Sequence, residues 1–152
     1  MRTIATIALL GAGLALAVPA ALAQDDAHEA RETLMKEVAG KNAKLGNQLA
    51  KGEIPYNAPM ASGAMKAISQ VPDKLAKLLP EGTDSVSDPK SEASPKIWTD
   101  MAGFLAAADK LKITSAAAAV AAEQGQQQFA IAFGNVFKAC KGCHDAYRVE
   151  KD

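Results

Sequence analysis

The sequence predicts an all-α protein that folds as an antiparallel up-down-up-down four-helix bundle. Three observations favour this fold over a β-sandwich or a barrel. The chain has 152 residues, the length of one domain. Aromatic residues make up only 5% of it, and Val and Ile are sparse, although pleated sheets need both kinds. Apolar residues also recur at helical spacing in four segments.

Residues 1–23 are typical of a cleaved secretory signal peptide. Arg2 gives the positive start, residues 4–18 are apolar, and Ala21-Leu22-Ala23 fits a small-residue cleavage site. The apolar run is about 15 residues long and a bilayer core requires roughly 20, which disfavours an uncleaved anchor. We expect a mature domain of residues 24–152 in the periplasm, with no stable membrane insertion.

The first two predicted helices cover about 25–51 and 58–79. Asp25 and Asp26 suit the start of the first helix, and Gly52 and Pro55 suit its end. One stripe follows steps of three and four residues along it: Arg31, Met35, Val38, Asn42, Leu45 and Leu49. Asn57 is the expected N-cap of the second helix, which Pro72 should kink or split.

A polar loop, residues 80–93, separates the second predicted helix from the third. The third covers about 95–123, with Ile113-Thr114-Ser115 as a candidate interruption. Gly125 then precedes a fourth helix, about 126–149. The mostly short connections favour antiparallel neighbours.

Both cysteines lie in Cys140-Lys141-Gly142-Cys143-His144, a C-x-x-C-H string that is the attachment signature for c-type haem. On a helix, positions i, i+3 and i+4 share one face, so two thiols and an imidazole point the same way. The thiols can add to the two vinyl groups of a haem, and His144 can reach its iron. We expect one covalent haem c per chain.

A zinc site and a redox disulfide are the alternative uses of this string. A zinc site needs three or four ligands, and beyond Cys140, Cys143 and His144 the chain offers only His28. A redox disulfide usually opens a helix after a strand, whereas these cysteines close an all-helical chain. A haem-free helical adaptor with a disulfide is the corresponding functional alternative.

Position along the bundle suggests the second axial ligand. Both termini of an antiparallel four-helix bundle lie at the same end. His144 is 152 − 144 = 8 residues from the C-terminus, roughly 12 Å, and Met35 is 35 − 24 = 11 residues from the mature N-terminus, roughly 16 Å. Met35 is therefore a candidate ligand, Met101 is its rival, and Met60 and Met65 begin the second helix at the opposite end. Core filling is the alternative role of Met35.

Four stretches resemble the class II c-type cytochromes, the cytochrome c prime family, over essentially the whole mature chain. They are Leu34-Met35-Lys36, Gly52-Glu53-Ile54-Pro55-Tyr56, Ser94-Pro95-Lys96-Ile97-Trp98 and the segment 138–148. The resemblance implies that Cys140 and Cys143 are the thioether anchors and His144 the proximal ligand. Leu-Met-Lys is most like the low-spin c-556 type, in which a methionine of the first helix is the sixth ligand, and Met35 falls on that position.

Several residues are candidates for supporting roles. Arg31 and Arg148 could contact the haem propionates, because a guanidinium matches a carboxylate bidentately, or could be solvated helix charges. Trp98, Met101 and Phe104 could line the haem pocket or be plain core. His28 is expected to face solvent near a helix end.

We therefore expect a periplasmic electron-transfer protein with His144 and Met35 as axial ligands and periplasmic redox proteins as partners. Its 17 basic and 17 acidic residues leave no basic footprint for nucleic acid. An enzyme is not expected, because no nucleophile, general-base pair or phosphate loop is visible. The chain could be a monomer or a homodimer. The alternative is a five-coordinate, high-spin protein that binds nitric oxide or carbon monoxide at an open distal site.

Overall fold

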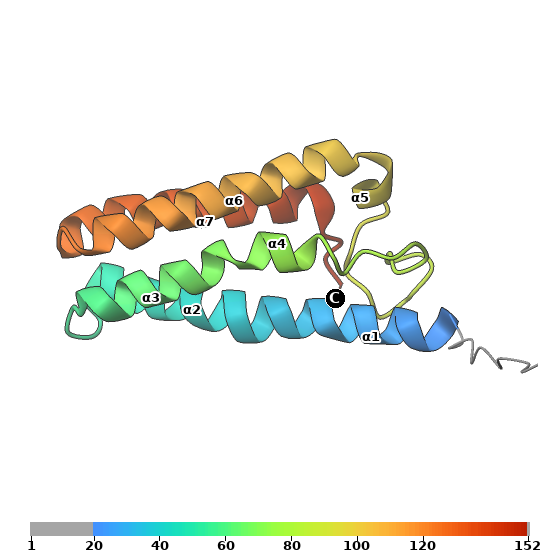
Figure 1. Ribbon diagram of the computed structural model, residues 1–152, viewed down its shortest axis with the longest axis horizontal. Helices are drawn as coiled ribbons and strands as arrows, with labels where there is room; N and C mark the ends of the chain where they lie inside the picture. Colours follow the sequence, from blue (N-terminus) through green and yellow to red (C-terminus); the bar gives the residue numbers. More distant parts are fainter. Residues whose placement is uncertain (1–19, 152) are drawn as a thin grey trace, which may run out of the picture.

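The computed structural model describes residues 20–151, in which helices are joined by loops and one isolated β-bridge (Figure 1). The elements are α1 (Ala20–Thr33), η1 (Leu34–Gly40), α2 (Lys41–Lys51), α3 (Ala58–Ser69), α4 (Val71–Leu75), α5 (Lys96–Thr99), α6 (Met101–Ala122) and α7 (Gln126–Tyr147). They form four antiparallel limbs, α1-η1-α2, α3-α4, α5-α6 and α7, so the predicted bundle is confirmed. The predicted signal peptide, residues 1–23, lies largely outside the described residues.

The first limb is helical from Ala20 to Lys51 but is not a uniform α-helix. It begins at Ala20 rather than at Asp25, because the alanines before Asp25 are strong helix formers. Its middle, η1, is a π-helix: the N–H of Lys41 donates to the carbonyl of Lys36, five residues back. Such segments are rare and are frequently found at functional sites. The predicted end is confirmed, since Gly52 caps α2 at a φ of 70°.

The second limb is split as predicted. The side chain of Asn57 caps α3 by accepting from the N–H of Met60 at 2.9 Å. A break at Gln70, two residues before Pro72, then separates α3 from α4. The second limb ends at Leu75 rather than near residue 79, and turns lead from there into the polar loop.

The third limb differs from the prediction in where it breaks. Asp100 interrupts it and caps α6, because its carboxylate accepts from the N–H of Gly103 at 3.1 Å. No interruption occurs at residues 113–115, since the hydroxyls of Thr114 and Ser115 donate to carbonyls one turn back. Helix α7 ends at Tyr147, because Arg148 is extended and forms the bridge with Ala93.

The apolar interior consists of two clusters. The main cluster lies toward the α2–α3 and α6–α7 connections and includes Leu49, Met65, Ile68, Phe129, Phe133 and Val136. A smaller second cluster joins Ile97, Phe104 and Tyr147 near the end of α7. The rings of Phe104 and Tyr147 meet edge to face, with their centroids 5.5 Å apart.

The first limb packs on α7 mainly through its α2 part. Helix α2 packs on α3 and α7, whereas η1 packs on α3 and α4. In Figure 1 the bundle accordingly widens toward the end where α1 begins and α7 ends. The first limb and the C-terminal half of α7 thus diverge at the end that carries the cysteines. Over the described range, no helix combines the length and the apolar character needed to cross a membrane.

Gly46 fixes the contact between α2 and α7, so we expect Gly46→Ala to destabilise the protein. A methyl group at Gly46 would lie 2.6 Å from Cε2 of Phe133 and 2.9 Å from Cε of Met65, and both side chains are buried. Overpacking of this kind costs about 1–3 kcal/mol. Urea unfolding of the haem-loaded protein measures the loss.

The matched control for that variant is Gly63→Ala in α3, where a methyl group meets nothing within 4 Å. Alanine should stabilise this helix by about 0.5–1 kcal/mol. Equal stabilisation by both variants would show that α2 and α7 are not in close contact at Gly46.

Candidate haem site

The C-x-x-C-H string lies on α7. It begins at Cys140, two turns before the helix ends at Tyr147. Both thiols are half-buried and free. Cys140 packs against the main cluster and Cys143 against the second one, so the string spans the junction of the two apolar clusters. His144 is exposed beside them. Two thiols and an imidazole are thus presented together, which is the donor set that a covalently attached haem requires.

Burial controls the protonation of these groups. Burial raises the pKa of the Cys140 thiol and that of the Cys143 thiol. The neighbouring Cys140 raises the pKa of Cys143 further. Partial desolvation lowers the pKa of His144, and Arg148 contributes in the same direction. Neutral thiols and a neutral imidazole are therefore favoured. A neutral imidazole has the free nitrogen lone pair that iron ligation needs.

The same properties disfavour a redox disulfide. The thiolate is the form that exchanges disulfides, and a raised thiol pKa reduces its population. Within residues 20–151, no group of three or more His, Cys, Asp and Glu side chains is placed to hold a metal ion. His28 lies instead against the polar loop, where its Nδ1 is 2.9 Å from Oδ2 of Asp88.

Met35 lies at the same level of the bundle as His144. The contact of Gly46 with Phe133 fixes the antiparallel register of the first limb and α7. His144 follows Phe133 by 144 − 133 = 11 residues, and Met35 precedes Gly46 by 46 − 35 = 11 residues. Eleven residues correspond to about 16 Å along α7, and to somewhat less along the first limb because η1 is a π-helix. The packing thus agrees with the level estimated from the termini, and ligation by Met35 stays a prediction.

Met35 and Met101 have different surroundings. Met35 is half-buried within η1 but belongs to neither of the two apolar clusters. Met101 packs in the second cluster, so its thioether already takes part in core contacts. The core-filling role suits Met101 better than Met35.

The residues expected to line the haem pocket are brought together. Trp98, Met101 and Phe104 all belong to or pack against the second cluster, as Cys143 does. The indole N–H of Trp98 donates to the carbonyl of Leu79 at 3.3 Å. Phe137 was not selected from the sequence; it is 64% exposed and lies seven residues before His144, on the same face of α7. The i, i+7 spacing could have identified it.

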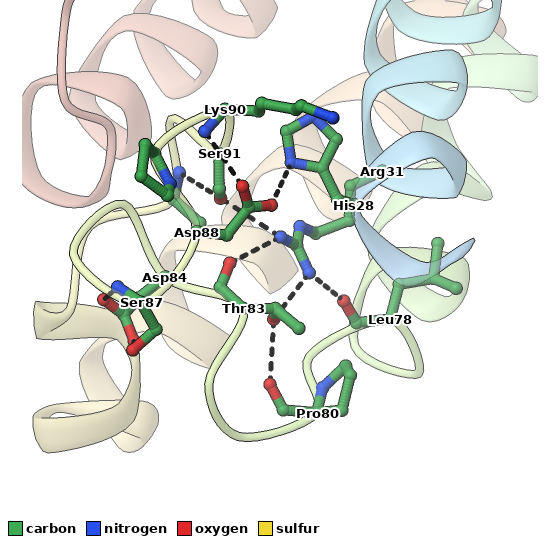
Figure 2. A network of polar contacts seen from close by, with 12 residues as sticks. His28, Arg31, Leu78, Pro80, Thr83, Asp84, Ser87, Asp88, Lys90 and Ser91 are labelled. Carbon is green, nitrogen blue, oxygen red and sulfur yellow. Dashed lines mark hydrogen bonds and ion pairs between the residues drawn. The ribbon is translucent and has the colours of Figure 1, made fainter. Parts of the chain in front are cut away.

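The two arginines have different environments. Arg148 is exposed, and its Nε donates to Glu92 at 2.6 Å. Arg31 is only 7% exposed and donates four hydrogen bonds to the polar loop (Figure 2). Propionate contacts by either residue stay predictions, and Arg31 would have to share its guanidinium with those bonds. His28 was expected to face solvent; this was wrong, because the loop covers it and leaves its side chain 17% exposed.

A groove of about 480 Å³ lies elsewhere, between α1, η1 and α4. Leu34, Val38 and Leu78 are among its lining residues, but Met35, His144 and the cysteines are not. It is therefore separate from the C-x-x-C-H site.

The bundle and this donor set together define a helical c-type haem protein. Residues 26–148 of the chain match the sequence model of the cytochrome c' family. A cytochrome c-556 from Agrobacterium tumefaciens is 36% identical over 129 residues, which cover 82% of this chain and 96% of that protein. The chain therefore belongs to the cytochrome c' family, and its cofactor is haem c with iron.

Solved structures agree with this assignment. A cytochrome c prime from Shewanella frigidimarina superposes with a TM-score of 0.74 at 30% identity, covering 84% of this chain and 97% of that one. The nitric oxide complex of a variant of cytochrome c prime from Alcaligenes xylosoxidans superposes with a TM-score of 0.73 at 26% identity, with the same coverage. The family thus includes proteins named c-556 and proteins named c'.

Proposed function

We propose that this protein is a periplasmic electron carrier in which His144 and Met35 bind the haem iron from opposite sides. The observation that carries the proposal is the common level of His144 and Met35, set by the contact of Gly46 with Phe133. The change of packing partners at η1, which separates the two helices there, also supports it. Residues 1–23 would act as the cleaved signal peptide that exports the domain of residues 24–152.

Cys140 and Cys143 would hold the haem covalently. In each attachment a sulfur–carbon bond forms to one vinyl carbon and the thiol hydrogen goes to the other, so no oxidant is needed. Half-burial between two apolar clusters keeps both thiols oriented and protonated for this addition. When bound, the haem supplies a one-electron ferrous–ferric couple.

His144 and Met35 would keep the coordination of the iron the same in both oxidation states. A small structural change on electron transfer follows, because neither ligand has to leave or enter. A thioether opposite an imidazole also raises the reduction potential relative to harder ligands. Trp98, Met101 and Phe104 would exclude water on the side of Cys143. The partners would be periplasmic redox proteins, and the chain would carry electrons rather than convert a substrate.

Binding of a diatomic gas is the second candidate. The specific observation in its favour is the nitric oxide complex of the Alcaligenes xylosoxidans relative. In that case Met35 would only cover the distal side of the haem, and the iron would be five-coordinate in the absence of gas.

A spectroscopic redox titration tests the choice. We expect a single reversible one-electron transition with low-spin optical spectra in both the oxidised and the reduced protein. A high-spin spectrum in the reduced protein would contradict permanent Met35 ligation and support the gas-binding function.

A further inference from the structure

The polar loop joins the two sides of the haem site. We use the term strap for residues 78–94, which lead from the end of the second limb to α5. Figure 2 shows the strap folded against α1, with Thr83 and Ser91 turned toward Arg31. Its other edge lies along the chain that follows α7.

Arg31 is the centre of the contact with α1. Its Nη1 donates to the carbonyl of Leu78 at 2.7 Å and to Oγ1 of Thr83 at 2.9 Å. Its Nη2 donates to the carbonyl of Thr83 at 2.7 Å and to Oγ of Ser91 at 3.2 Å. Thr83 and Ser91 are 0% and 1% exposed. One guanidinium thus binds three separate points of the strap in a buried setting, where losing a partner is costly.

His28 adds a second contact one turn earlier. Its Nδ1 lies 2.9 Å from Oδ2 of Asp88. The N–H of Lys90 donates to the other Asp88 oxygen at 2.9 Å and, with the added effect of His28, lowers the pKa of Asp88. The carboxylate is therefore held in its charged form toward α1.

The opposite edge of the strap is paired with the end of α7. The N–H of Ser94 donates to the carbonyl of Tyr147 at 3.0 Å, and the N–H of Val149 donates to the carbonyl of Glu92 at 2.8 Å. The Glu92 carboxylate also accepts from Arg148. This pairing begins three residues after His144.

Direct packing between the first limb and α7 is made mainly by α2. The first limb leaves α7 at η1, which rests on α3 and α4 instead. Arg31 lies one helical turn before Met35, and Tyr147 lies three residues after His144. The strap is bonded to both places, so it links the segment that carries Met35 to the segment that carries His144.

We propose that the strap sets the separation between Met35 and His144, and that Arg31 is a positioning residue that holds Met35 on the iron through Thr83 and Ser91. This rests on the proposed function, since it requires Met35 to be an iron ligand.

The test measures carbon monoxide affinity of the reduced, haem-loaded protein, because carbon monoxide can bind only where Met35 has left the iron. Arg31→Lys removes the forked contact but keeps the charge. Thr83→Val removes the hydroxyl that accepts from Arg31 and that also donates to the carbonyl of Pro80 at 2.8 Å. If the fraction with free iron rises from about 1% to about 10%, the affinity rises about tenfold. We expect both variants to show this gain.

The matched control is Val86→Ala, also in the strap, where the side chain is 78% exposed. It should leave the affinity unchanged. Each strap variant is also combined with Met35→Ala. If the strap acts through Met35, Thr83→Val has no further effect once Met35 is gone, whereas general loosening of the bundle would still change the affinity.

The outcomes separate the strap from the axial ligand. A tenfold gain in Arg31→Lys without one in Thr83→Val would overturn the proposal and assign Arg31 to the haem propionates. Wild-type affinity in both variants would also overturn it, while leaving Met35 ligation intact. A wild-type protein that binds carbon monoxide as tightly as Met35→Ala would instead remove the proposed function itself.

Discussion

Replacement of Met35 by alanine should convert the protein from a six-coordinate to a five-coordinate haem protein. Alanine has no sulfur atom to donate to the iron. Low-spin optical bands should give way to high-spin ones. If free iron is about 1% of the wild-type population, carbon monoxide affinity should rise about a hundredfold. The reduction potential should fall by on the order of 100 mV, because the thioether favours the ferrous state.

Two other methionines provide the controls for this variant. Met60 begins the second limb and is 49% exposed at the far end of the bundle, so Met60→Ala should keep the wild-type spectrum. Met101→Ala should also keep it, while losing some stability because Met101 packs in the second cluster. A high-spin spectrum in Met101→Ala with an unchanged one in Met35→Ala would exchange the two roles.

Replacement of both Cys140 and Cys143 by alanine should abolish covalent attachment of haem. No further cysteine exists in the chain, so no thioether can form. Mass spectrometry of denatured protein from a host that matures c-type cytochromes should give the wild-type chain plus one haem and the double variant without it. Each single variant should retain at most one bond.

Lys141→Ala is the control for the double variant, because Lys141 lies between the cysteines and its contact with Asp145 is an exposed ion pair. It should keep the haem mass. Haem mass retained after denaturation of the double variant would show attachment through some other residue, and the roles given to Cys140 and Cys143 would then be wrong.

Local sequence patterns predicted the parts of this structure that depend on local spacing. Asn57 and Gly52 act as caps where their side-chain chemistry requires it, and Pro72 accompanies the split of the second limb. The C-x-x-C-H string lies on one helix, as its spacing indicates. These features need only neighbouring residues, so periodicity and capping rules are sufficient to find them.

Features that depend on distant residues could not be predicted. Arg31 was expected to contact a haem propionate or to be a solvated helix charge, and His28 was expected to face solvent. Nothing near either residue in sequence shows that residues 78–91 cover them. The π-helical segment was also not predicted, because the stripe at steps of three and four residues assumed a uniform α-helix through residues 34–40. The break between α5 and α6 at Asp100 was not predicted. The Asp100 carboxylate caps α6 and also accepts from the Tyr147 hydroxyl at 2.8 Å, a contact with a residue distant in sequence.

The most direct test of the central claim is X-ray absorption at the iron edge, because it counts the atoms bound to the metal. The thioether sulfurs of Cys140 and Cys143 would be bonded to the porphyrin and not to iron, so only Met35 or another methionine can supply a sulfur ligand. We expect five nitrogens and one sulfur in both oxidation states, with the sulfur lost in Met35→Ala. A wild-type iron bound by nitrogen alone would contradict the proposed axial pair.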